Sequence, residues 1–382
     1  MEPRIEAIDA RTLNPPVGMA LQSRTVEVVD WEVTRLTGGA GGGTDQSAVY
    51  RVQGAARDLG RAVPWQIILK ILRAPANREP ADLAWKREAE AYRSGLLKSL
   101  PEGLAAPRCF GTEEFPGGSC WLWLEEVSDE FPTWPLERYG MAARHLGRLS
   151  GANSAEQSEV RWPWLSADWV RQDMVQVIAE ADRLRENLGD PLLHRFLPEE
   201  ASQNALRLLA EREDFLAILN TLPQTLCHFD AFRRNMFSRR RLDQQETVLI
   251  DWAFVGRGPI GAEIVSLVWV SLAFGEIDSG NAAALDQIAF DGFLLGLRDV
   301  GWHGDPALVR LAYTAAIALR RLGTLGHALP YILDERLHAR MEEVMRMPIT
   351  HLADQWARAG DYIDILADEA RERIRFIGSS LS

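Results

Sequence analysis

The most distinctive spacing in the chain lies in the stretch LCHFDAFRRNMF, where Asp230 follows His228 and Asn235 stands five residues further on. Sixteen residues after Asn235, Asp251 ends an apolar run. This order of side chains is typical of phosphoryl transfer, in which one aspartate takes the proton of the attacking hydroxyl and an amide and a second aspartate hold Mg²⁺. Mg²⁺ prefers such hard oxygen ligands. We therefore predict that Asp230 is catalytic and that Asn235 and Asp251 are metal ligands.

Other residues of this stretch have more than one interpretation. We expect His228 to brace the loop rather than to act as a base. Arg233 and Arg234 either contact phosphate, which arginine binds with two hydrogen bonds, or lie in solvent. A metal hydrolase built on His228 and Asp230 is disfavoured, because no further His, Asp or Glu cluster stands at ligand spacing.

A glycine-rich segment lies upstream, between two predicted strands, and has five glycines in six positions. Glycine lets backbone N–H groups approach phosphate closely. The segment is not a Walker A loop, because it lacks the Gly-Lys-Ser/Thr ending and a strand follows it. We interpret it as a loop that covers a nucleotide, the alternative being an ordinary hairpin tip. Its candidate nucleotide-binding residues are Gly38, Gly39, Gly41, Gly42, Gly43 and Thr44.

Lys70 is the only lysine among the first 85 residues, and it interrupts the apolar run WQIILKIL. An ammonium group in such a strand is costly unless an anion accompanies it. ATP phosphates together with a glutamate on a helix would supply that anion. The alternative is a surface lysine on an edge strand.

The pattern of apolar residues changes near residue 127. Before it, short β-type runs surround one helical stretch at 81–100, and residues 1–22 are expected to be extended or loosely helical. After it, helical spacing covers 136–150, 167–187, 198–222 and 262–375, with a β-type island at 225–251. We expect an α+β protein with a β-rich domain over residues 1–127 and a helical domain over 128–382.

Composition excludes several classes of protein. The 382 residues are 47% hydrophobic with a net charge of −12, as in ordinary globular proteins and unlike a nucleic-acid-binding surface. The longest apolar run, Ile264–Phe274, is too short to span a membrane. Three scattered cysteines and a charged N-terminus favour a cytoplasmic location. The oligomeric state is not predicted.

Residues 31–260 resemble the aminoglycoside phosphotransferase and choline kinase-like family, which shares the protein-kinase fold. The resemblance rests on the His-x-Asp-x4-Asn motif, on Ile250-Asp251-Trp252 and on the segment GRGPIGAEIVSLV. That segment has Glu263 where the family usually has Asp, a departure that we expect to concern anchoring of the scaffold. The resemblance implies a bilobal fold, with a small antiparallel-sheet lobe carrying one helix and a larger helical lobe, and ATP and Mg²⁺ as cofactors.

The resemblance also implies roles for residues that spacing alone does not identify. Glu88 would pair with Lys70, with Glu90 as the alternative partner. Glu125 and Val127 would contact adenine through main-chain groups in the connection between the lobes.

These features together favour a phosphotransferase that moves the γ-phosphate of ATP to a hydroxyl of a small molecule. An amine-bearing or sugar-like acceptor fits the acidic second domain, and Trp162, Trp164 and Trp169 either contact it or pack the core. Residues 252–261 are too few for the peptide-binding segment of a protein kinase. The alternative from another class is a kinase-like regulator that binds ATP without turnover.

Overall fold

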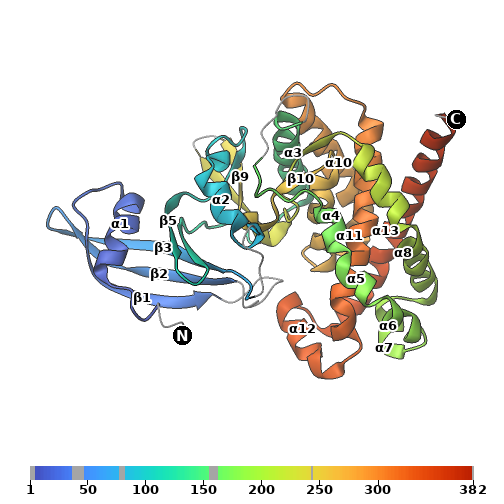
Figure 1. Cartoon of the computed structure of the whole chain (residues 1–382), viewed down its shortest axis with the longest axis horizontal. Coiled ribbons are helices and arrows are strands. Elements are labelled where there is room, and N and C mark those ends of the chain that lie inside the picture. The colour runs from blue at the N-terminus through green and yellow to red at the C-terminus, as the bar shows by residue number, and fades with distance from the viewer. Residues whose placement is uncertain (1–4, 37–46, 77–81, 155–161, 242–243, 381–382) are drawn as a thin grey trace.

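A computed structural model describes residues 5–36, 47–76, 82–154, 162–241 and 244–380, which form two lobes (Figure 1). The N-terminal lobe is built on a five-stranded antiparallel sheet in the order β1-β2-β3-β6-β5. The bilobal α+β fold expected from the sequence is confirmed. The strands of this sheet are β1 (Glu27–Leu36), β2 (Ser47–Asp58), β3 (Arg61–Arg73), β5 (Cys109–Phe115) and β6 (Ser119–Leu124).

The two faces of this sheet are covered by different helices. Successive strand residues point to opposite faces, so Ile67, Leu69 and Ile71 of β3 are buried with the apolar residues of α1 (Ala10–Leu21). Leu72 is buried on the other face, among residues of α2 (Arg87–Arg93). Lys70 is two residues before Leu72 in the strand, so its side chain lies on the same face of the sheet and points toward α2.

Helices α1 and α2 begin and end for local reasons. The Asp9 side chain accepts a hydrogen bond from the backbone N–H of Thr12 and caps α1, so the lead-in segment is helical over these residues. Helix α2 is shorter than the predicted stretch 81–100. Gly95 follows it with φ 84°, a left-handed conformation that ends a helix.

Helices dominate the C-terminal lobe, and their buried faces form one continuous apolar core. The predicted helix over 167–187 is broken into three short helices, and the stretch 262–375 into several, including a π-helical segment at Ser266–Val270. No helix among the described residues is long and apolar enough to cross a membrane. The helices are α3 (Leu136–Ala152), α4 (Trp169–Asp173), α5 (Val175–Ala179), α6 (Ala181–Glu186), α7 (Pro191–Phe196), α8 (Glu199–Thr221), α9 (Ser271–Ala273), α10 (Ala282–Asp299), α11 (Pro306–Ile332), α12 (His338–Met345) and α13 (Ile349–Ser380).

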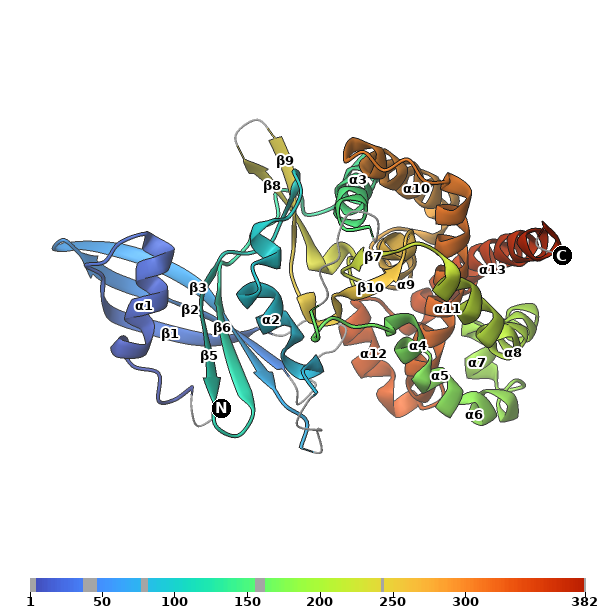
Figure 2. The same ribbon diagram turned by 45° about the horizontal axis from the view of Figure 1, so that its top comes forward.

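Two small sheets lie between the N-terminal sheet and these helices (Figure 2). In one of them β7 (Gln224–Cys227) pairs with β10 (Gly256–Pro259). The other has the order β4-β9-β8, and its members are β4 (Leu104–Ala105), β8 (Met236–Arg241) and β9 (Gln244–Leu249). The loops after β7 and β9 carry the motif residues, so these short strands position the site.

Helices α3 and α10 pack so closely that glycines are required in the contact. A Cβ atom on Gly296 would overlap the carbonyl oxygen of Arg144, and one on Gly292 would overlap that of Gly140. The backbones of the two helices are therefore in contact.

We expect Gly296→Ala to lower the free energy of unfolding by about 1–3 kcal/mol, because the added methyl group must push the two helices apart. Chemical denaturation measures the change. Gly189→Ala is the control, since nothing lies within 4 Å of a Cβ atom built there. Equal stability of the two variants would contradict backbone contact between α3 and α10.

Candidate active site

His228 lies at the start of the loop between β7 and β8 and is completely buried. Its Nε2–H donates to the carbonyl oxygen of Ile250 at 3.0 Å, and its Nδ1 accepts from the backbone N–H of Asp230 at 3.2 Å. Burial lowers the pKa of His228 to about 4, so the ring is neutral near pH 7 with its proton on Nε2. The histidine therefore braces two loops and has no free nitrogen for proton transfer.

Asp230 and Asn235 contact each other directly at the two ends of this loop. Asn235 Nδ2 donates to Asp230 Oδ2 at 2.8 Å and to the Asp230 carbonyl oxygen at 3.0 Å. Both bonds use the Asn235 Nδ2 group, so its amide oxygen Oδ1 takes part in neither. Burial raises the pKa of the Asp230 carboxyl to about 7, although the guanidinium of Arg320 opposes the rise.

Asp251 follows β9 with φ 61°, a left-handed conformation that is uncommon for aspartate. Its Oδ1 lies 2.9 Å from Lys70 Nζ, and 40% of its side-chain surface is exposed. The backbone N–H of Ile250 donates to the Asn235 carbonyl oxygen at 3.0 Å. This bond places the loop of Asp251 beside the loop of Asp230 and Asn235.

Lys70 has a second carboxylate partner in the N-terminal lobe. Its Nζ lies 2.5 Å from Glu88 Oε2, and Glu88 is buried. Burial lowers the pKa of Lys70, but the two carboxylates outweigh it and raise that pKa above its ordinary value. For Asp251, burial opposes ionisation, yet Lys70 holds its pKa below the usual range.

The alternative partner of the lysine, Glu90, lies elsewhere on α2. Its carboxylate is 3.5 Å from Lys86 and 3.2 Å from Arg93. The structure therefore brings Lys70, Glu88 and Asp251 together and leaves Glu90 in a surface network.

Glu263 stands where the family usually has an aspartate, and its side chain binds the backbone of the loop that begins at His228. Its Oε2 accepts hydrogen bonds from the backbone N–H groups of His228 at 2.6 Å and Phe229 at 3.3 Å. Phe229 has φ 66°, so these bonds hold a strained turn of the backbone. Burial raises the pKa of Glu263 to about 8.

A backbone hydrogen bond and an ion pair hold the connection between the lobes, residues 125–127, against the N-terminal sheet. The backbone N–H of Glu125 donates to the Arg108 carbonyl oxygen at 2.8 Å, so a main-chain contact of Glu125 with a base would use its carbonyl oxygen. Glu126 forms an ion pair with Arg51 of β2 at 2.5 Å. Val127 follows in the same connection and is half-buried.

The remaining candidates either lie outside the described residues or have side chains bound to other parts of the protein. The glycine-rich loop, residues 38–44, is not among the residues that the structure describes. Arg233 binds Asp129 at 2.7 Å, and Arg234 binds Glu276 at 2.5 Å and the Val344 carbonyl oxygen at 2.7 Å. Both arginines therefore serve the protein scaffold.

The tryptophan cluster is mainly a packing feature. Trp164 and Trp169 are buried, and Trp162 stacks on Trp164 with ring centroids 5.4 Å apart. Trp169 stacks on Phe229, beside Asp230, at 4.8 Å. The interpretation as core residues is thus supported, with Trp169 lying next to the loop that carries Asp230.

Two charged residues near Asp230 were missed by sequence reasoning. Arg320 of α11 has Nη2 3.6 Å from Asp230 Oδ1, and it also pairs with Asp173 at the end of α4. Both lie in helices without a recognisable motif, and no signal in a single sequence singles them out.

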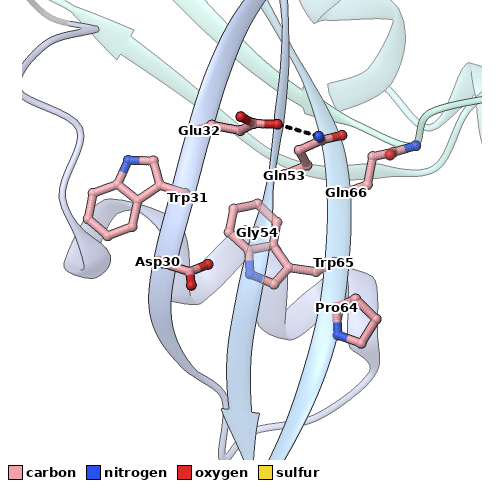
Figure 3. A pocket seen from close by; sticks show the side chains of 8 residues that line it. All are labelled: Asp30, Trp31, Glu32, Gln53, Gly54, Pro64, Trp65 and Gln66. Atoms are coloured by element: carbon pink, nitrogen blue, oxygen red, sulfur yellow. Dashed lines mark hydrogen bonds between the residues drawn. The ribbon is translucent and has the colours of Figure 1, made fainter.

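An open hollow of about 690 Å³ lies on the N-terminal sheet, on its first three strands, and none of the motif residues lines it (Figure 3). Gln53 donates to Glu32 across it. It is therefore separate from the candidate active site. Its lining residues are Asp30, Trp31, Glu32, Gln53, Gly54, Pro64, Trp65 and Gln66.

Comparison with known proteins identifies the family. Residues 39–304 match the model of the phosphotransferase enzyme family (APH), which is more than half of the chain, and the chain therefore belongs to this family. It is a phosphotransferase, as the motif predicted. No curated protein sequence matches the chain.

Solved structures share its fold at low sequence identity. An amicoumacin kinase, hAmiN, in complex with AMP-PNP, Ca²⁺ and Ami is 15% identical with a TM-score of 0.53, covering 94% of this chain and 97% of the other. A microcompartment-associated aminopropanol kinase is 16% identical with a TM-score of 0.50, covering 94% and 99%. Both support the kinase-like fold.

The side chains gathered here are the largely buried carboxylate of Asp230, the amide of Asn235 and the 40% exposed carboxylate of Asp251 beside Lys70. Among the described residues, no group of three or more His, Cys, Asp and Glu side chains is placed to hold a metal ion. One carboxylate and one amide are sufficient where phosphate oxygens complete the ligands.

We expect Glu263 to contribute a part of the free energy of unfolding that is lost as the pH rises from about 5 to about 8. A glutamate in the unfolded chain loses its proton near 4.5, whereas Glu263 in the folded chain does so near 8. The folded state binds more protons between these values, so raising the pH favours unfolding. Glu263→Gln removes this contribution.

Denaturant unfolding at several pH values measures the effect. Relative to the glutamine variant, the wild-type free energy of unfolding should drop by at least about 1.4 kcal/mol, the equivalent of one pKa unit. Identical pH slopes for the two proteins would show that Glu263 is ionised in the folded state.

Proposed function

We propose that the protein transfers the γ-phosphate of ATP, with Mg²⁺, to a hydroxyl group of a small molecule. The observation that carries the proposal is the convergence of two groups of side chains: Lys70 with Glu88 and Asp251, and Asp230 with Asn235. The Asn235–Ile250 backbone bond joins these groups. A phosphate donor held by the first group would lie beside the base in the second.

The donor atoms near Asp251 fit Mg²⁺. Asn235 uses its Nδ2 toward Asp230, so its Oδ1 is the atom available to a cation. The Asp251 carboxylate is 40% exposed, whereas the side chain of its partner Lys70 is 10% exposed. These two oxygen-bearing side chains would hold the ion, which would supply positive charge to the phosphate oxygens of the nucleotide.

In the proposed reaction Asp230 orients the acceptor hydroxyl and accepts its proton at a carboxylate oxygen. A carboxyl whose pKa is near 7 balances basicity against the fraction ionised at neutral pH. Lys70, oriented by Glu88, would neutralise phosphate charge. The nucleotide would lie under the glycine-rich loop (residues 38–44) and against the main chain at Glu125 and Val127.

We propose an amine-bearing or sugar-like acceptor. The net charge of −12 favours a cationic molecule, and the similar aminopropanol kinase is named for an amine-bearing alcohol. The segment after Asp251 supports a small acceptor rather than a peptide. It is a 3₁₀ turn, Trp252–Phe254, followed by β10, which is paired with β7.

The test is an ADP-release screen of the purified protein against aminoglycosides, amino alcohols, sugars and macrolides. With the acceptor found, Asp230→Asn should reduce the rate by about 10²–10⁴-fold, the contribution of a general base. ATP–Mg²⁺ should still raise the melting temperature of this variant. Asp291→Asn, an exposed aspartate of α10, is the control and should keep its activity.

Two outcomes would contradict the proposal. An Asp230→Asn variant with full turnover would remove the proposed base. ATP–Mg²⁺ binding by the wild type without transfer to any acceptor would instead favour the non-catalytic regulator.

A second pair of variants tests the lysine partner. Glu88→Gln should lower kcat/KM for ATP by at least about tenfold, because Lys70 loses the partner that orients it. Glu90→Gln, on the same helix but bound to Lys86 and Arg93, should stay within about twofold of wild type. Steady-state kinetics with varied ATP measures both, and equal losses would contradict the assignment of Glu88.

A further inference from the structure

Arg320 connects the catalytic loop to two elements of the helical lobe. Its Nη2 lies 3.6 Å from Asp230 Oδ1, and its Nη1 forms an ion pair with Asp173 Oδ1. Its guanidinium also lies over the ring of Trp169, 4.7 Å from the centroid. The side chains of Arg320, Asp173 and Asp230 are 15%, 8% and 15% exposed, so this carboxylate–guanidinium–carboxylate bridge is largely buried.

We propose that Arg320 is a positioning residue for Asp230. Asp173 holds the Arg320 guanidinium so that this group does not form a close hydrogen bond with Asp230 Oδ1. The proposal rests on the proposed function, in which Asp230 takes the proton of the acceptor hydroxyl. It adds two residues outside every motif to the machinery of that step.

The two oxygens of Asp230 are held differently. Oδ2 accepts a hydrogen bond from Asn235 at 2.8 Å. Oδ1 faces Arg320 at 3.6 Å, which is longer than an ordinary N–H···O hydrogen bond of about 2.7–3.2 Å. One firm contact and one loose contact fix the plane of the carboxylate, and Oδ1 keeps room for the incoming proton.

Asp173 accounts for the looseness of the second contact. Arginine binds a single carboxylate most strongly through two parallel hydrogen bonds. Here the guanidinium is shared, and Asp173 is the closer partner. Without Asp173, the guanidinium would be free to close on Asp230 and occupy Oδ1.

Packing keeps Asp173 and Arg320 in place. A Cβ atom on Gly323, one turn along α11, would overlap Asp173 Oδ2, so α4 lies directly against α11. Trp169 has its ring stacked on Phe229 with an interplanar angle of 15°, and Arg320 lies over the same ring. The bridge is therefore attached to the catalytic loop both through Asp230 and through Phe229.

The chain offers a matched control in the next residue of α11. Arg321 forms an ion pair with Asp364 of α13, and the two side chains are 10% and 15% exposed. This pair has similar burial and chemistry, but it joins helices and does not contact the catalytic loop. Arg321→Met and Asp364→Asn therefore report the cost of losing a buried ion pair in this helix.

The experiment measures kcat, the KM for ATP and the melting temperature for wild type and for variants of both pairs. Arg320→Met should lower kcat by about 10–100-fold, the scale expected for a misplaced catalytic group, with the KM for ATP within about twofold. Arg320→Lys should recover part of the loss. Arg321→Met and Asp364→Asn should leave kcat within about twofold even where they lower the melting temperature.

The double variant Asp173→Asn/Arg320→Met distinguishes restraint of Arg320 by Asp173 from general structural damage to the lobe. Asp173→Asn alone should lower kcat by about tenfold or more, because the released guanidinium pairs with Asp230. Adding Arg320→Met should bring kcat to the level of Arg320→Met alone. Independent structural damage would give the product of the two losses instead.

Three results would overturn the proposal: equal kcat losses in Arg320→Met and Arg321→Met, a multiplicative loss in the double variant, or no loss in Asp173→Asn. If wild type binds ATP–Mg²⁺ but phosphorylates no acceptor, the proposed function fails, and the positioning role with it. If wild type is active and the Arg320 variants match the controls, the positioning role alone fails.

Discussion

The ammonium group of Lys70 lies between two carboxylates, one on α2 in the N-terminal lobe and one on the loop after β9 in the C-terminal lobe. Taking a charge out of water is costly, and removing one partner of a buried ion pair typically destabilises a protein by about 3–5 kcal/mol. Glu88 and Asp251 must therefore stay near the lysine. This requirement, together with the hydrogen bonds from Arg87 of α2 to the Trp164 and Ala253 carbonyl oxygens, holds the sheet and α2 against the loops of the site.

The catalytic loop obtains its rigidity from backbone hydrogen bonds rather than from regular secondary structure. The His228 ring accepts from the backbone N–H of Asp230 within the loop and donates to the Ile250 carbonyl oxygen outside it. The Glu263 carboxylate accepts from the backbone N–H of His228. Asn235 adds a bond to the Asp230 carbonyl oxygen. A loop whose amides and carbonyls are held by buried side chains leaves Asp230 little conformational freedom, as the proposed contact with a hydroxyl would require.

Local spacing predicted the parts of the site that lie within one stretch of chain. The motif from His228 to Asp251 was recognisable because loop length and strand polarity determine which side chains meet. Lys70 was recognisable because a charge inside an apolar strand requires a partner. The choice between Glu88 and Glu90 needed the rotation of α2, which a helix of seven residues with glutamates near both faces does not define.

The fold class was predictable from the change of periodicity near residue 127, whereas several boundaries were not. Tertiary packing divides the expected helix over 167–187 into α4, α5 and α6. Arg320 and Asp173 are separated by 147 residues and meet only because α4 packs on α11. Helical periodicity indicates that such residues are on a helix, but it contains no information on which helices become neighbours.

The short strand β4 belongs by sequence to the N-terminal half, yet it pairs in parallel with β9 through Leu104 and Ala105. The backbone N–H of Thr247 donates to Gly103 in the same region. A fragment beginning after residue 127 would lack this strand and would expose the edge of β9, the strand that delivers Asp251. The two halves of the polypeptide are thus interleaved, and neither is a self-sufficient folding module that gene fusion or truncation could exchange freely.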